Sequence, residues 1–285
     1  MTDIWVPWIC FRIATVDKAD AAKSALRTAY SDSRKRLNAI AVSADSTQFK
    51  IARSRAIIRQ IDKEIARLDL VAGNVAKVVI PEAYGASVLK TAAVAGEPAR
   101  IGAVLHRNAI NTLVAEMTGD LQTANAEIGK FFTRTVRASQ QKILADKQLS
   151  KAVAQGLIEG ETRKGVSNNM YDLLKERLGK NQSLTINGRN YDPRKYADLV
   201  ARTRTREAAS HGTINTCLQV GMDLVRISQH ANASEICQPF EGNIYSISGS
   251  SKEYPKLEEY PPYHPNCRHI MNGFDEETVR RRKAG

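Results

Sequence analysis

Residues Ile57-Ile-Arg-Gln-Ile-Asp-Lys-Glu-Ile-Ala-Arg-Leu68 contain the pattern that decides the fold of most of this chain. Ile57, Ile61, Ile65 and Leu68 recur every three or four positions, and charged residues occupy most of the positions between them. An α-helix with 3.6 residues per turn places residues so spaced on one face. The stretch therefore predicts an amphipathic helix that follows Asp45 and buries an isoleucine stripe.

Similar spacing continues on both sides of this stretch. Upstream, the stripe that predicts a helix consists of Ala22, Leu26, Ala29, Tyr30, Leu37 and Ile40. Downstream, apolar residues predict a helix over 101–117 and a long helix over 121–144. We expect Pro81, Gly85 and the Gly96–Pro98 segment to punctuate the chain, and Thr118-Gly119-Asp120 to end the third helix. The first part of the chain is thus predicted to be a helical body, whose stripes pack against one another.

The pattern changes after residue 180. Asn187-Gly188 between β-forming residues predicts a hairpin, and Asp192-Pro193 predicts the start of a helix that ends at Gly221. Apolar and polar residues alternate over 224–228 and 243–248, as in half-buried strands, and a loop rich in proline and tyrosine follows. The predicted fold class is α+β, with a mainly α-helical body over 1–180 and a small α+β module over 181–285.

Charge and composition restrict the partners. The 285 residues carry a formal net charge of +12, which attracts polyanions such as DNA. Only 6% of the residues are aromatic, so contact with phosphates is favoured over base stacking. The candidate DNA-contacting residues are Arg202, Arg206, Arg280, Arg281, Arg282 and Lys283; a solvated basic surface is the alternative. We expect no signal peptide and no membrane-spanning helix.

Cysteine and histidine residues concentrate near the C-terminus. His230, Cys237, His264 and Cys267 form a candidate zinc site, with His269 as a substitute ligand, because four soft or borderline ligands close a tetrahedral structural site. Two alternatives remain open. The cysteines are small buried residues beside hydrogen-bonded histidines, or they form a disulfide, which a reducing cytoplasm disfavours.

Catalysis receives little support from the sequence. No nucleotide-binding loop, dinucleotide fingerprint or HExxH motif is present. The alternative function is a DNA-processing, nuclease-like enzyme that uses the C-terminal His/Cys cluster, with His264 or His269 as the base. No cluster of acidic residues with metal-ligand spacing accompanies these histidines, so we predict that the protein is not an enzyme.

Three stretches resemble the phage head-morphogenesis and minor capsid protein family. They are Arg202-Thr-Arg-Thr-Arg-Glu-Ala-Ala-Ser-His-Gly212, Cys237-Gln-Pro-Phe-Glu-Gly-Asn-Ile-Tyr-Ser-Ile-Ser-Gly249 and Pro261-Pro-Tyr-His-Pro-Asn-Cys-Arg-His269. The last stretch is the most specific, although His269 stands where many family members have cysteine. The resemblance implies a virion protein present in several copies, assembled in the host cytoplasm and associated with the portal and the major capsid protein.

Overall fold

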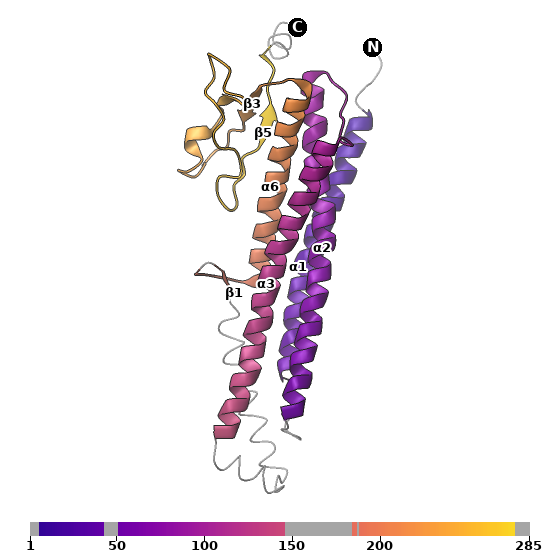
Figure 1. Ribbon diagram of the computed structural model, residues 1–285, viewed down its shortest axis with the longest axis vertical. Coiled ribbons are helices and arrows are strands. Elements are labelled where there is room, and N and C mark those ends of the chain that lie inside the picture. The colour runs from indigo at the N-terminus through magenta and orange to yellow at the C-terminus, as the bar shows by residue number, and fades with distance from the viewer. Residues whose placement is uncertain (1–5, 43–50, 146–183, 187, 277–285) are drawn as a thin grey trace. The chain divides into compact units, whose positions relative to one another are not determined.

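The computed structural model describes residues 6–42, 51–145, 184–186 and 188–276. The described helices are α1 (Val6–Val42), α2 (Ile51–Ala95), α3 (Val104–Ala145) and α6 (Pro193–Val220), with the short 3-10 helix η1 (Gln238–Phe240). The described strands are β1 (Leu184–Ile186), β2 (Arg189–Tyr191), β3 (Leu224–Ile227), β4 (Ile244–Ser246) and β5 (Met271–Gly273). Figure 1 shows the long helices and short strands, and the α+β class is confirmed.

Contacts divide the chain into two compact units, and neither is continuous in sequence. One unit comprises 1–25, 73–118 and 198–285, and the other comprises 26–72 and 119–197. We call the first the sheet-bearing unit, because it contains β3, β4 and β5, and the second the helical unit. The domain boundary predicted near residue 180 falls within 146–183, outside the described residues, and stays a prediction.

The helical unit buries the stripes that the sequence predicts. Its core contains Leu26, Tyr30, Leu37, Ile57, Ile61, Leu68, Leu121, Ala124, Ile128 and Phe132. A polar chain links all three helices: Tyr30 donates to Asn125 Oδ1 at 2.6 Å, and the Asn125 amide donates to Asp69 Oδ1 at 2.7 Å. Buried polar groups that satisfy one another in this way fix which faces of the helices meet.

Two predicted interruptions of the helices are wrong. Helix α2 runs without a break through Pro81 and Gly85, and α3 runs through the predicted stop at Thr118-Gly119-Asp120. An interior proline costs a helix about 3 kcal/mol and a glycine about 1 kcal/mol. Burial of one large apolar side chain returns roughly 1.5–3 kcal/mol. Fully buried side chains flank each site: Val79, Ile80, Tyr84, Met117 and Leu121.

Other predicted boundaries are confirmed. Helix α2 ends at Ala95, before Gly96, which has a φ of 69°. The Asp192 carboxylate accepts the backbone N–H groups of Arg194 and Lys195, as an N-cap does, and α6 ends before Gly221. β1 and β2 form the predicted antiparallel hairpin, although Asn187 itself lies outside the described residues.

The sheet of the sheet-bearing unit has the strand order β4-β3-β5 and is antiparallel throughout. Strands β3 and β4 lie where the sequence predicts them, whereas β5 was not predicted. The sheet packs on α6 through a core of Cys217, Val225, Ile227 and Met271, and the strands lie beside that helix in Figure 1. Thr213 of α6 also donates to the backbone oxygen of Met271. These contacts anchor the loops that carry the cysteine and histidine residues.

One helical stretch is relevant to the expectation that the chain has no membrane-spanning helix. Arg55–Ala95 of α2 is long and apolar enough to cross a membrane by length and composition alone. Core helices of proteins that never enter a bilayer satisfy the same criterion, and α2 contributes many of the buried side chains named above.

Candidate metal centre

Two loops beside the three-stranded sheet carry the candidate site. Cys237 immediately precedes η1, and its backbone N–H donates to the Ser234 oxygen at 2.8 Å. Cys267 closes a turn in which its N–H donates to the His264 oxygen at 3.0 Å. Asn266 within that turn has a φ of 69°, a left-handed conformation that asparagine tolerates better than most residues. The local backbone thus directs both cysteines into one place.

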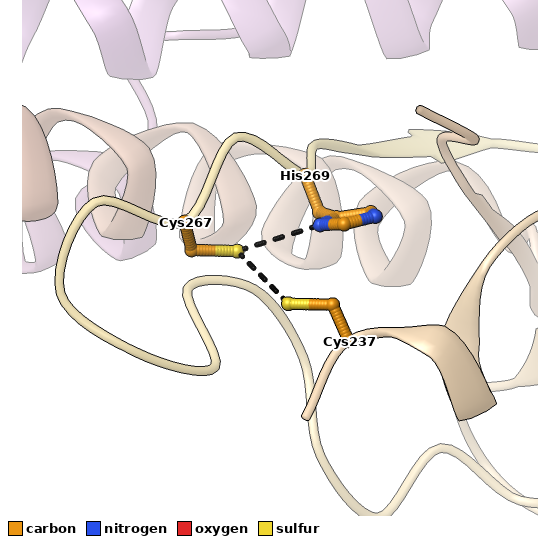
Figure 2. A group of neighbouring side chains, drawn as sticks. All are labelled: Cys237, Cys267 and His269. Atoms are coloured by element: carbon orange, nitrogen blue, oxygen red, sulfur yellow. Dashed lines mark hydrogen bonds between the residues drawn. The ribbon is translucent and has the colours of Figure 1, made fainter. Parts of the chain in front are cut away.

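Cys237, Cys267 and His269 form a compact group of potential metal ligands, drawn in Figure 2. The two sulfur atoms are 3.9 Å apart, and Cys267 Sγ lies 3.6 Å from His269 Nδ1. All three ligand atoms lie within 4.8 Å of one another, and all three residues are buried. A disulfide requires sulfur atoms about 2.05 Å apart, so both cysteines are free here. The group can hold a metal ion.

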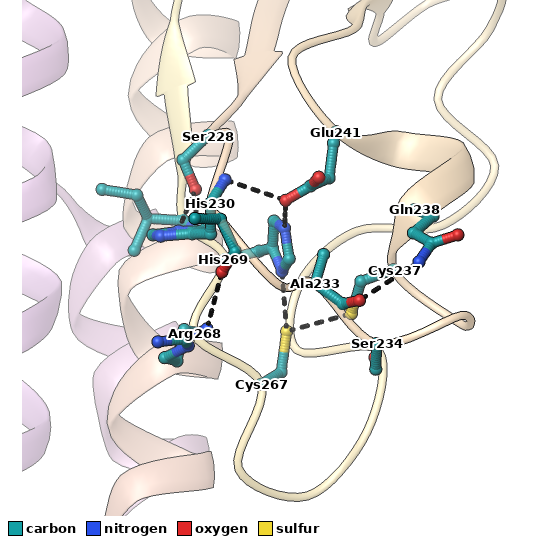
Figure 3. Close-up of polar contacts among 12 residues, drawn as sticks. Ser228, His230, Ala233, Ser234, Cys237, Gln238, Glu241, Cys267, Arg268 and His269 are labelled. Atoms are coloured by element: carbon teal, nitrogen blue, oxygen red, sulfur yellow. Dashed lines mark hydrogen bonds and ion pairs between the residues drawn. The ribbon is translucent and has the colours of Figure 1, made fainter.

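Glu241 orients the buried histidine. His269 Nε2 lies 2.8 Å from Glu241 Oε1, and the same oxygen accepts the backbone N–H of His230 at 2.8 Å (Figure 3). The hydrogen bond from His269 is the main reason that the pKa of Glu241 lies below its usual value. Glu241 accepts from His269 Nε2, and Nδ1 is the ring nitrogen that lies near Cys267.

His264 stands at one edge of the group. Its Nε2 lies 3.1 Å from Cys237 Sγ and 2.9 Å from Ser234 Oγ, and its Nδ1 lies 2.8 Å from the Pro265 oxygen. A carbonyl oxygen can only accept, so Nδ1 is the donor in that contact, and Nε2 is the ring nitrogen that lies near the sulfur.

His230 has a different environment from the other candidates. Its Nε2 pairs with Ser228 Oγ at 2.9 Å, and its ring meets the ring of His269 edge-on, with centroids 4.8 Å apart. Burial, together with the nearby His269 and Arg268, lowers the pKa of His230. The structure therefore brings His230 beside the group through ring contact, while Cys237, His264, Cys267 and His269 approach one another through ligand atoms.

The surroundings of Cys237 do not activate a thiolate. Burial raises the pKa of the Cys237 thiol, and the adjacent Cys267 acts in the same direction. Tyr263 stacks on Phe240 with ring centroids 4.2 Å apart, and its ring lies 6.3 Å from the His269 ring between centroids. Nucleophilic cysteines need a lowered pKa and access for a substrate, and the Cys237 environment supplies the opposite.

The predicted DNA-contacting residues that the structure describes lie on α6. Arg202 is exposed and pairs with Asp198 at 2.9 Å, while Arg206 is half-buried. Arg204, between them, pairs with both Glu116 and Glu207 at 2.7 Å. Arg280, Arg281, Arg282 and Lys283 lie outside the described residues.

Sequence reasoning missed Glu241 and Ser234, which contact the two histidines. The signal for Glu241 was available, because this carboxylate lies four residues after Cys237, at the end of the segment that forms η1. Its pairing with His269, which is 28 positions away, depends on how the two loops meet.

The fold and the site define a mainly helical protein with a small C-terminal sheet, and loops beside that sheet carry a buried Cys/Cys/His group. The family model of phage minor capsid protein 2 matches residues 34–282. The chain belongs to this family and is a phage minor capsid structural protein. Comparison with curated proteins and with solved structures gave no match.

Proposed function

We propose that this protein takes part in head morphogenesis and associates with the portal and the major capsid protein in the phage head. The observation that carries the proposal is the family match over 34–282, because it spans parts of both units and the candidate metal centre. In this proposal the chain folds in the host cytoplasm and enters the virion in several copies, without a membrane partner. The body over 1–180 provides the contacts with the portal and the capsid, and the module over 181–285 follows the body in sequence.

A phage with a stop codon early in this gene tests the assembly role. The gene is supplied from a plasmid either intact or with Gly119→Ala, which we expect to be silent because nothing lies within 4 Å of the ideal Cβ of Gly119. Without complementation we expect defective heads, and with it we expect the chain in purified virions beside the portal. Normal DNA-filled heads that lack the chain would overturn the proposal.

We further propose non-specific contact with double-stranded DNA. Its support is the net charge of +12 and the basic residues Arg280, Arg281, Arg282 and Lys283 near the end of the chain. Each phosphate that a cation neutralises adds about 0.9 to the slope of log affinity against log salt. Replacing these four residues with glutamine should lower the slope by up to about 3.6. Arg204→Gln is the matched control, since carboxylates already neutralise Arg204, and it should leave the slope unchanged. If the four substitutions left the slope unchanged, these basic residues would not belong to the DNA interface.

We propose that zinc is the metal of the Cys/Cys/His group. Thiolate sulfur and imidazole nitrogen are the ligands that zinc takes in structural sites. Elemental analysis of the purified chain should give about one zinc per chain. Metal-free chain whose thermal unfolding ignores a chelator would contradict this assignment.

We propose that the group is structural and not catalytic. The raised pKa of Cys237 and the engagement of Glu241 by His269 and His230 support this role. The rival is a nuclease that uses the same histidines. Supercoiled plasmid incubated with the protein and each of several divalent metals should persist; cleavage that disappears in His264→Ala and His269→Ala would establish the rival instead.

A further inference from the structure

We propose that His264 is the fourth ligand of the metal centre and that it closes a tetrahedral Cys2His2 site with Cys237, Cys267 and His269. This inference rests on the proposed zinc. In this ligand set His269 takes the place of His230, which the sequence favoured. A fourth protein ligand makes a closed structural site, whereas an open site would have a water in the fourth position.

Two of the distances between the grouped ligand atoms match edges of a zinc tetrahedron. With Zn–S bonds of about 2.3 Å and Zn–N bonds of about 2.05 Å, tetrahedral angles give S–S edges of about 3.8 Å and S–N edges of about 3.6 Å. The observed Sγ–Sγ distance is 3.9 Å, and the Cys267 Sγ–His269 Nδ1 distance is 3.6 Å.

Both histidines are oriented as metal ligands. A ligating imidazole commonly donates its other N–H to a carboxylate or a backbone carbonyl, which fixes the tautomer and the ring. His269 does so through Nε2 to Glu241, and His264 does so through Nδ1 to the Pro265 oxygen. In each ring the other nitrogen lies near a cysteine sulfur, at 3.6 Å for His269 and 3.1 Å for His264.

The position of His264 suits a ligand that arrives last. Its imidazole touches the group at Cys237, and the turn that joins it to Cys267 places both residues on one short loop. Completing the tetrahedron requires the ring to approach Cys267 and His269 as well. Metal binding would therefore draw the 264–267 turn against η1 and hold the two loops together.

His230 is a poor fourth ligand for a geometric reason. Its Nε2 is engaged by Ser228 Oγ, which in turn accepts the Ile270 N–H at 3.0 Å. The contacts that the structure gives the His230 ring are with Ser228 Oγ and with the His269 ring, whereas His264 Nε2 lies 3.1 Å from Cys237 Sγ. The contact of His230 with His269 is ring to ring.

The test uses full-length chain and three variants: His264→Ala, His264→Cys and His230→Ala as the matched control. Zinc content and zinc affinity are measured by chelator competition, and cobalt absorption spectra of the same proteins report the ligand set. We expect His264→Ala to weaken zinc binding at least about 100-fold, since the removal of outer contacts alone costs 10–100-fold. His264→Cys should retain the metal and gain intensity in the sulfur-to-cobalt bands. His230→Ala should keep the wild-type cobalt spectrum.

Each outcome decides between the two claims. Wild-type chain without zinc or cobalt binding would overturn the zinc proposal itself. Wild-type chain that binds zinc, together with a His264→Ala variant of unchanged affinity and cobalt spectrum, would overturn only the fourth ligand. If His230→Ala altered the cobalt spectrum and both His264 variants left it unaltered, His230 would be the fourth ligand. Because His264 is half-exposed and lies on a loop, its substitutions should not prevent folding.

Discussion

Gly212 of α6 lies against the backbone of Tyr84 in α2, so closely that a Cβ atom at position 212 would stand 2.6 Å from the Tyr84 carbonyl oxygen. Real Cβ atoms essentially never approach backbone so closely, and a carbonyl inside a helix cannot move away cheaply. Two helices of the sheet-bearing unit therefore meet at a distance that glycine alone permits.

Gly212→Ala should destabilise the protein by about 1–3 kcal/mol, the usual range for overpacking a filled site. Gly119→Ala is the control, because Gly119 is also helical and has nothing within 4 Å of its ideal Cβ. That change should stabilise by about 0.5–1 kcal/mol, since alanine loses less backbone entropy than glycine in a helix. Urea unfolding measures both. Equal effects of the two substitutions would refute the close contact.

Glu64 of α2 provides a pH-dependent contribution to the helical unit. It accepts hydrogen bonds from Ser33, Arg36 and Arg67. Burial acts to raise the pKa of Glu64, but these hydrogen bonds outweigh burial and lower the pKa below 4.5. A carboxyl with a lowered folded-state pKa stabilises the fold above its unfolded pKa and loses that contribution as pH falls through the folded value.

Glu64→Gln should therefore cost about 1–3 kcal/mol at neutral pH, and the difference from wild type should shrink below about pH 4.5. Glu127→Gln removes an exposed pair with Lys130 and should cost under about 1 kcal/mol. Unfolding free energies measured between pH 3 and pH 7 test this. A difference that stays constant over that range would exclude the ionised Glu64 as its source.

Tyr84 lies at the centre of a buried polar network in the sheet-bearing unit. Its hydroxyl contacts His106 Nδ1 at 2.9 Å and accepts the Asn215 amide at 2.7 Å, and His106 Nε2 meets Gln219 Oε1 at 3.1 Å. Tyr84→Phe leaves Asn215 and His106 short of a partner, so we expect a loss of about 1–3 kcal/mol. The double variant Tyr84→Phe/Asn215→Leu should recover part of that loss. A double variant that is destabilised by the sum of both changes would show that the groups act independently.

Thiol labelling distinguishes the cysteines of the candidate metal centre from the core cysteine. Burial raises the pKa of Cys217 to about 12, and its side chain is fully buried in the core between α6 and the sheet. In a Cys10→Ser background, zinc-loaded protein should label slowly at all three remaining cysteines. Chelation should accelerate labelling at Cys237 and Cys267 and leave Cys217 slow. Mass spectrometry of the labelled peptides reads each site, and acceleration at Cys217 instead would mean that chelation unfolds the core.

The limits of sequence prediction follow from the range of the interactions. The stripe from Leu26 to Leu37, the Asp192 cap and the end of α6 at Gly221 are encoded within a few residues each, and all were predicted correctly. The breaks at Pro81 and Thr118-Gly119-Asp120 were wrong, because local helix penalties there are smaller than the burial gained on either side. Strand β5 contains Asn272 between Met271 and Gly273 and has no alternating pattern long enough to reveal it.

By itself the sequence determined that this chain builds amphipathic helices, that a small β-containing module follows them, and that cysteine and histidine gather in that module. Only the tertiary structure decided which of these side chains meet. His230, His264 and His269 are chemically alike along the chain, and no spacing rule separates them. The sheet register and the two loops that pack beside it turn His269 and His264 towards the sulfur atoms, and they leave His230 paired with Ser228. Contacts between residues about 30 positions apart depend on the packing of whole elements, whereas a helical period depends on neighbours alone.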